Sequence, residues 1–270
     1  MTNIYKLTFL FIGFSLAACT SKKEKLTQKI YELEISDSSS TPNGMNNLAT
    51  MYFDYATQFD KDSIAEKYMF KGFMFKYIIK HWDEAISYAN YYKSNFPVSE
   101  SYHMVNLKLA DLYHTGKNNI DSAVHYYMIC DGKVQFSTAE KRISASVLQK
   151  WVNANPNTPT SAHTLYTAAK LLQMANEYNA SASLYNAVAL KYPLFKKSPD
   201  ALLAAGFIYW ENLKNLKQAE MCYKQLAEKY PLHPLAKEAK TILSDNILAM
   251  SDLELADHLI KKNKAKIKTP

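Results

Sequence analysis

Apolar side chains recur along this chain, from Met45 onward, at the spacing that places them on one face of an α-helix. The composition agrees with this pattern, because only 6 Gly are present and the 9 Pro stand at a few junctions. Low glycine content favours helices over a sandwich or barrel, whose many turns need it. The sequence therefore predicts an all-α fold over residues 45–262, with no sheet.

Small residues recur within the helical region at a step of thirteen. A small residue in each of two helices lets them approach closely, and a proline can begin a helix but not continue one. Prolines stand thirteen residues before three of these pairs, at Pro97, Pro156 and Pro193. The step therefore predicts helical hairpins that bury their apolar faces by stacking on neighbours. The pairs are Gly72 and Ala85, Ala110 and Ala123, Ala169 and Ala182, and Gly206 and Ala219.

This pattern resembles tetratricopeptide repeats, most clearly in Ala204–Tyr209, Ala219–Tyr223 and Lys229–Pro231. The resemblance implies an α-solenoid of tetratricopeptide-like helical hairpins. Beyond the hairpins we expect a starting helix, one extra helix, a closing helix and a basic tail. The expected hairpin units are about 61–97, 98–135, 157–193 and 194–231, and the other segments are 45–58, 137–155, 234–262 and 263–270.

The first twenty residues have the order of an export signal. Lys6 supplies a short positive region, Leu7–Phe14 is apolar, and Leu16–Cys19 reads Leu-Ala-Ala-Cys. The apolar run is shorter than a membrane span, so it predicts a signal peptide at 1–18. The tetrapeptide resembles the bacterial lipobox, which implies that Cys19 becomes the acylated first residue, carrying fatty acids such as palmitate. An ordinary cleaved signal with a chance cysteine is the alternative.

The polar stretch 36–44 cannot pack a core, so we expect residues 19–44 to form a lipid-anchored flexible tether, with room for a short helix at Lys25–Leu33. After Cys19 the chain lacks the Asp that signals inner-membrane retention in Gram-negative lipoproteins. It also lacks the acidic run that resembles a surface-export signal in Bacteroidetes. By that resemblance we expect an outer-membrane lipoprotein facing the periplasm.

The chain also resembles tetratricopeptide lipoproteins of Bacteroidetes and, more distantly, BamD-like outer-membrane assembly lipoproteins. The stretches that carry this resemblance are Phe59–Ala65, Tyr68–Gly72 and Tyr230–Ala236. Phe59 stands where that family has a proline, and the second unit ends in Gln135. The resemblance implies an envelope protein but does not specify its partner.

The net charge and the two remaining cysteines indicate no specific binding or catalytic site. The net charge of +7 comes largely from lysines near the C-terminus, which we interpret as a solvated end, with nucleic acid or an anionic membrane as the alternatives. Cys130 and Cys222 match no metal-ligand spacing. A disulfide between them is chemically feasible after export, but a repeat array separates them widely, so we expect two buried thiols.

Candidate catalytic groups are missing from the sequence. The seven histidines form neither an HExxH motif nor a pair at i, i+4, and 6 Gly leave little room for a phosphate-binding loop. The terminal lysines lack interleaved aromatic residues, which argues against nucleic acid. We therefore predict no enzyme activity, no cofactor, no metal and no small-molecule substrate.

The remaining candidate is an interaction surface. In tetratricopeptide arrays the first helix of each hairpin lines a groove, which implies envelope proteins or their peptides as partners. We expect a non-enzymatic scaffold serving outer-membrane protein assembly or another envelope complex. The alternative is an accessory factor of a cell-wall or secretion enzyme. The expected groove residues are Phe73, Lys76, Tyr77, Asp111, His114, His163, Lys170, Met174, Phe207, Trp210 and Glu211.

Overall fold

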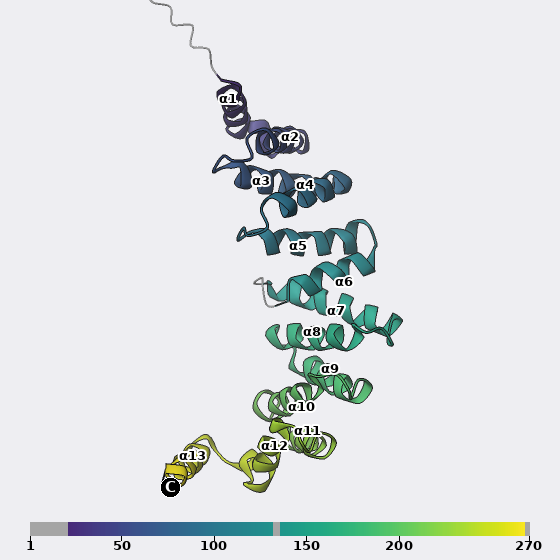
Figure 1. Cartoon of the computed structure of the whole chain (residues 1–270), viewed down its shortest axis with the longest axis vertical. Helices are drawn as coiled ribbons and strands as arrows, with labels where there is room; N and C mark the ends of the chain where they lie inside the picture. The colour runs from purple at the N-terminus through teal and green to yellow at the C-terminus, as the bar shows by residue number, and fades with distance from the viewer. Residues whose placement is uncertain (1–20, 132–135, 268–270) are drawn as a thin grey trace, which may run out of the picture. The chain divides into compact units, whose positions relative to one another are not determined.

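The computed structural model describes residues 21–131 and 136–267 (Figure 1). Within these ranges the chain forms thirteen α-helices, short 3₁₀ and π turns, and no strand. Successive helices pack as hairpins, which confirms the predicted all-α solenoid of tetratricopeptide-like units. The described residues divide into two compact units, with the boundary between Pro97 and Val98. No helix in the described ranges combines the length and apolarity of a membrane span.

The first unit contains four helices that pack in chain order. Helix α2 lies between α1 and α3, and α3 pairs with α4. Aromatic rings fill the spaces between them, as where Tyr52 stacks on Tyr68 with ring centroids 4.9 Å apart. The elements are α1 (Lys22–Glu34), η1 (Asp37–Ser40), α2 (Pro42–Gln58), α3 (Ala65–Ile78) and α4 (Trp82–Asn95).

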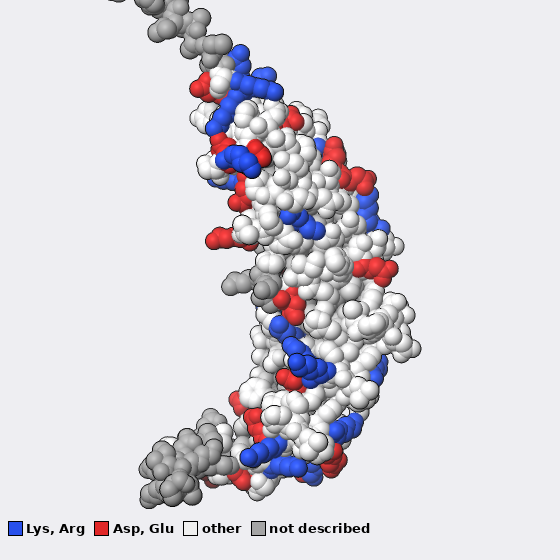
Figure 2. Space-filling view, in the orientation of Figure 1, with Lys and Arg blue, Asp and Glu red and all other residues white. Residues whose placement is uncertain are grey.

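The expectation of a flexible tether is wrong for residues 22–44, which form α1, η1 and the start of α2. Ser21 and Glu24 make a reciprocal capping box that begins α1. Ile30 on this helix is 0% exposed and packs against Tyr52 and Tyr55 of α2. Burial of this apolar residue fixes a segment that polar composition alone had suggested was unstructured. Lysines gather on the exposed side of α1 (Figure 2). Residues 1–20, with Cys19, lie outside the described ranges.

The second unit contains the three hairpins that the repeat step predicts there, and one extra helix. The extra helix, expected at 137–155, is α7. The elements are α5 (Tyr102–Asp111) with the π turn η2 (Leu112–Gly116), α6 (Ile120–Ile129), α7 (Thr138–Ala154), α8 (Ser161–Met174), α9 (Tyr178–Lys191), α10 (Ser198–Phe207) with the π turn η3 (Ile208–Asn212), α11 (Leu216–Lys229), α12 (Pro234–Ser244), η4 (Ile247–Ala249) and α13 (Asp252–Ile267).

The turn inside each of the four hairpins uses the same backbone device. In each turn, one non-glycine residue adopts a left-handed conformation two positions before the second helix begins. These residues are Lys80, Asn118, Asn176 and Lys214, with φ between 48° and 60°. This conformation ends the first helix and is tolerated best by Gly and Asn. A fifth such residue, Asn246, follows α12 with φ 53°. The closing segment expected at 234–262 is therefore two helices rather than one.

The helices of the second unit lie in two layers. One layer contains α5, α7, α9 and α11, as shown by the Lys108–Glu140 ion pair and the Cys222–Asn186 hydrogen bond. The other layer, which we call the cleft layer, contains α6, α8, α10 and α12. The Lys170–Asp131 ion pair joins α8 to the end of α6, and α10 contacts α12 directly. Because neighbouring helices alternate between layers, the extra helix α7 shifts every later first helix into the opposite layer from α5.

Candidate functional site

The cleft layer carries an apolar depression of about 500 Å³, here called the aromatic cleft. Helices α8, α10 and α12 supply its walls, and one residue of α11 closes its floor. Its lining is mostly aromatic and aliphatic, with two carboxylates, and it consists of Tyr166, Asp200, Leu203, Ala204, Phe207, Trp210, Tyr223, Glu238 and Ile242.

Phe207 and Trp210 lie where α10 passes into the π turn η3. Phe207 is the last residue of α10, and Trp210 lies within the turn. Their rings meet edge to face, with centroids 6.3 Å apart and planes at 86°. Phe207 is 46% exposed although it is a large apolar residue. Such a ring pair presents area to a ligand at low entropic cost, because each ring already holds the other in place.

Two carboxylates enter the aromatic cleft from different helices, Asp200 from α10 and Glu238 from α12. Burial raises the pKa of Tyr166, and the negative charge of Asp200 raises it further. Burial likewise raises the pKa of Tyr223, with a smaller contribution from Glu238. Both carboxylates are therefore close enough to act on the rings that line the cleft. Lys197 lies at its edge, with its ammonium 5.3 Å from the centroid of the Tyr166 ring.

A second depression of about 400 Å³, the histidine cleft, lies between α6, α7 and α8. The indole Nε1 of Trp151 donates a hydrogen bond to Asp121 across it, at 2.7 Å. The Thr164 hydroxyl is buried without a partner in the described residues. The ring of His163 lies 6.4 Å from that of Phe195, which in turn meets Tyr166 of the aromatic cleft. The lining is Asp121, Val124, His125, Met128, Ile129, Trp151, Thr160, His163 and Thr164.

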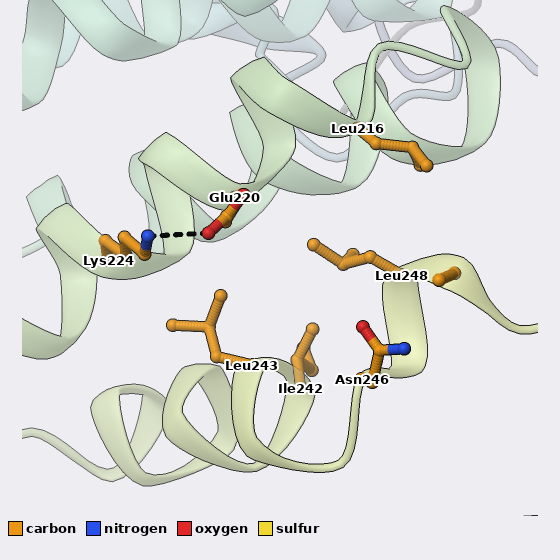
Figure 3. A pocket seen from close by; sticks show the side chains of 8 residues that line it. Leu216, Glu220, Lys224, Ile242, Leu243, Asn246 and Leu248 are labelled. Carbon is orange, nitrogen blue, oxygen red and sulfur yellow. Dashed lines mark ion pairs between the residues drawn. The ribbon is translucent and has the colours of Figure 1, made fainter.

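A third depression, the terminal cleft, lies between α11, α12 and η4 (Figure 3). Its volume is about 320 Å³. Glu220 is its single carboxylate and pairs with Lys224 at 2.5 Å. The apolar lining of this cleft comes from Leu216, Ile242, Leu243, Leu248 and Ala249, and Asn246 completes it. Its charge is thus neutralised internally, unlike that of the aromatic cleft.

The expected groove residues on α8 and α10 all lie outside the core. Phe207 and Trp210 line the aromatic cleft, and His163 lines the histidine cleft. Glu211 pairs with Lys214 beside the cleft at 3.4 Å. The two remaining residues line none of the three clefts. They are Lys170, which pairs with Asp131 at 2.9 Å, and Met174, which is exposed at the end of α8.

The expectation that Phe73 and Lys76 line a groove is wrong, because both are buried at 0% and 1% exposure. Helices α2 and α4 cover α3 on both sides. The Lys76 ammonium donates to Asn46 of α2 at 2.7 Å and to Glu84 of α4 at 2.6 Å. It is therefore a structural link between three helices.

Tyr77 is partly covered at the end of α3. Its ring lies 6.0 Å from that of Trp82 and 6.4 Å from that of Phe73. These contacts place Tyr77 within the packing of the α3–α4 hairpin, and only part of its ring remains available to a partner.

Asp111 and His114 belong to α5 and its π turn, in the layer opposite to the cleft layer. Both are partly buried, and neither lines any of the three clefts. The Nδ1 atom of His114 is buried without a hydrogen-bond partner in the described residues. Their expected place in a groove shared with α8 and α10 is wrong, because α7 shifts the later hairpins by one layer.

Most residues that line the aromatic cleft were missed from the sequence, among them Tyr166, Asp200 and Glu238. Tyr166 lies three residues after His163, on the same face of α8, so helix spacing alone could have identified it. Asp200 precedes Phe207 by seven residues and shares its face. Glu238 gave no such signal, because it lies on a helix that was expected only to close the array.

The described ranges contain no arrangement of side chains that indicates a metal site or a reactive cysteine. No group of three or more His, Cys, Asp or Glu side chains is placed to hold a metal ion there. Cys130 and Cys222 are free buried thiols, as expected, and burial raises the pKa of the former to about 12 and of the latter to about 11. Both are thus protonated at neutral pH and are poor nucleophiles.

Residues 200–233 match the family model of the tetratricopeptide repeat. This match covers most of α10, η3, all of α11 and the connection to α12, which are elements of the aromatic cleft. Among solved structures, YrrB, described as a TPR protein with an unusual peptide-binding site, is 16% identical, with a TM-score of 0.30. The similarity covers 81% of this chain and 99% of that one. No curated protein matches the sequence.

Proposed function

We propose that this protein is a non-enzymatic scaffold that binds a segment of another protein in the aromatic cleft. The observation that carries the proposal is the exposed Phe207 ring, held edge to face by Trp210, in an apolar cleft of about 500 Å³. Aromatic residues of this kind supply much of the binding energy at protein interfaces. The cleft is large enough for a few side chains of a bound segment.

The fold supports an interaction role over a catalytic one. Hairpin repeats present side chains from several helices on one continuous surface. Residues 200–233, which match the tetratricopeptide repeat, include several residues of the aromatic cleft. Tetratricopeptide arrays are typically non-enzymatic scaffolds. A cleft lined chiefly by apolar residues, with two carboxylates but no paired acid and base, is suited to binding rather than bond breaking.

The place of action that we propose is the periplasmic face of the outer membrane. The support is the sequence Leu16–Cys19 after an apolar run, which resembles a lipobox. Several acyl chains on Cys19 would give lasting attachment, because each buried CH₂ contributes roughly 0.8 kcal/mol. A scaffold held there would meet envelope proteins, including those that assemble outer-membrane proteins.

Site-specific photo-crosslinking in cells tests the binding surface. A benzophenone side chain at position 207 should capture a partner, whereas the same group at Leu190 should not. Leu190 is a matched control because it is exposed and apolar but lies on α9, in the other layer. Equal capture from both positions, or from neither, would contradict the proposal.

The contribution of the indole is tested separately. Trp210→Ala should reduce capture from a crosslinker at position 203 by roughly tenfold or more, as expected for an interface hot spot. The circular dichroism spectrum should keep its helical signal, because Trp210 is only partly buried. Undiminished capture would remove Trp210 from the binding surface.

Labelled palmitate tests the membrane attachment. The wild-type protein should incorporate the label and fractionate with the outer membrane, and Cys19→Ala should lose both properties. Retention of the label in Cys19→Ala would contradict acylation at this residue. Fractionation of the labelled wild-type protein with the inner membrane would contradict the proposed location alone.

A further inference from the structure

The two carboxylates of the aromatic cleft lack a partner in the described part of the chain, whereas several other acidic groups of the second unit are paired. Glu140, Glu177, Glu211 and Glu220 each pair with a lysine or arginine. Within the described residues, neither Asp200 nor Glu238 has a hydrogen-bond or ion-pair partner.

Position in a helix does not account for both carboxylates. Asp200 lies in the first turn of α10, where the helix dipole favours a negative charge. Glu238 is the fifth residue of α12 and has less benefit from that effect. The two residues come from different helices and line one cleft with Phe207 and Trp210. Their shared feature is therefore the cleft that they face.

The aromatic rings of the cleft attract a positive charge, and so do its two carboxylates. A cation over an aromatic ring is attracted by the negative face of the ring. The structure already contains one example, because the Lys197 ammonium lies over Tyr166 at the edge of the cleft. Asp200 is partly buried, so water screens its attraction for an entering cation less than at a fully exposed site.

We propose that the aromatic cleft selects a basic-apolar segment of its partner, which places a lysine or arginine between Asp200 and Glu238. A neighbouring apolar side chain of that segment packs against Phe207 and Trp210. This inference rests on the proposed function and specifies the chemistry of the bound segment. An acidic segment is disfavoured because its carboxylates would face two unneutralised negative charges.

Peptide display against the full-length lipidated protein in detergent tests the inference. A library of random decapeptides should yield sequences enriched in Lys or Arg beside Leu, Phe or Trp. A synthetic peptide of the recovered sequence then serves as the probe for affinity measurement. Recovery of neutral or acidic sequences, or of no sequence that Trp210→Ala weakens, would overturn the inference.

Charge-removing variants identify the carboxylates directly. Asp200→Asn combined with Glu238→Gln should weaken the probe about tenfold, or about 1.4 kcal/mol. Glu220→Gln combined with Glu228→Gln is the matched control on α11 and should leave affinity within twofold. The affinity of the wild-type protein should also fall with added salt, and that dependence should shrink in the cleft variant. An unchanged affinity and salt dependence in the cleft variant would overturn the inference.

The two proposals fail in different ways. If the cleft carboxylates have no effect but Trp210→Ala still weakens the probe, the scaffold function stands and the charge preference is wrong. If Trp210→Ala also has no effect, and a crosslinker at position 207 captures nothing in cells, the proposed binding surface itself is wrong.

Discussion

Gly206 lies against the ring of Tyr223 so closely that a β-carbon on it would stand 2.9 Å from two ring carbons. The two residues belong to α10 and α11, the hairpin that carries the aromatic cleft. Tyr223 is 1% exposed and packs in the core of this hairpin, so its ring can shift only toward the aromatic cleft. This contact explains why a glycine begins the thirteen-residue step in this unit.

Gly206→Ala should therefore lower the free energy of unfolding. Alanine gains up to about 1 kcal/mol of helix propensity over glycine, but overpacking costs about 1–3 kcal/mol and should prevail here. Urea denaturation measures the difference. The same change at Gly72 is the matched comparison, because its added β-carbon would stand 3.2 Å from the nearest atom, the carbonyl oxygen of Ala49. A larger loss at Gly72 than at Gly206 would contradict this account.

The thirteen-residue step was sufficient to predict the hairpins because it reports a local requirement. Two helices joined by a short turn can approach closely only where they carry small side chains, so Gly206 and Ala219 mark the two helices of one hairpin. Both are buried in the α10–α11 hairpin. The family match over residues 200–233 falls on the unit where this pattern is clearest.

The groove was harder to predict because it depends on which helices cover which faces. Phe73 was expected to line the groove, yet α2 and α4 enclose it. Helical spacing identifies a face of α3 but does not say that a helix beginning at Pro42 packs over it. Asp111 was misplaced for a related reason, since one extra helix between α6 and α8 exchanges the layers of all later hairpins. Glu238 was missed because α12 was expected only to close the array, whereas it forms a wall of the cleft.

Lys76 connects three helices of the first unit, and the pKa of its partner Glu84 is sensitive to this connection. The pKa of Glu84 is lowered chiefly by the hydrogen bond from Lys76, with a further contribution from His81. Because folding lowers the pKa of this carboxyl, the carboxylate stabilises the folded state at pH values above its ordinary pKa of about 4.5. That stabilisation is lost as the pH falls.

Lys76→Met should raise the pKa of Glu84 toward its ordinary value while keeping most of the apolar stem of the side chain. Stability should then depend less on pH below about 4.5, because the ionised carboxylate no longer has this partner in the fold. Carbon-detected NMR titration gives the pKa, and urea denaturation between pH 3 and 6 gives the stability. Lys29→Met, on the exposed side of α1, should change neither measurement.

Cys130 and Cys222 should be unreactive until the second unit unfolds. Their thiols are buried, and each makes a weak hydrogen bond, to the carbonyl oxygen of His103 and to the side chain of Asn186 respectively, at 3.4 Å. Burial raises the pKa of both, so the folded state favours the protonated thiol. That contribution to stability is fully present below the ordinary pKa of about 9 and is lost as the pH rises toward 11–12.

The measurement uses Cys19→Ala, so that only the two buried thiols remain. Ellman's reagent at pH 8 should react with both in urea and with neither in buffer, over minutes. Fast reaction in buffer would contradict the burial of these side chains. Denaturation at pH 10 should occur at lower urea concentration than at pH 8.

The layer arrangement predicts which crosslinkers reach the partner. His163 lies on α8 in the cleft layer, and its ring contacts Phe195, which meets Tyr166 of the aromatic cleft. Thr115 is also exposed but lies in the π turn that continues α5, in the other layer. A benzophenone at position 163 should therefore capture the same partner as one at position 207, and one at position 115 should not. The identity of the captured partner is compared by mass spectrometry. Capture from position 115 with none from 163 would show instead that the partner binds the layer of α5 and α7, opposite to the aromatic cleft.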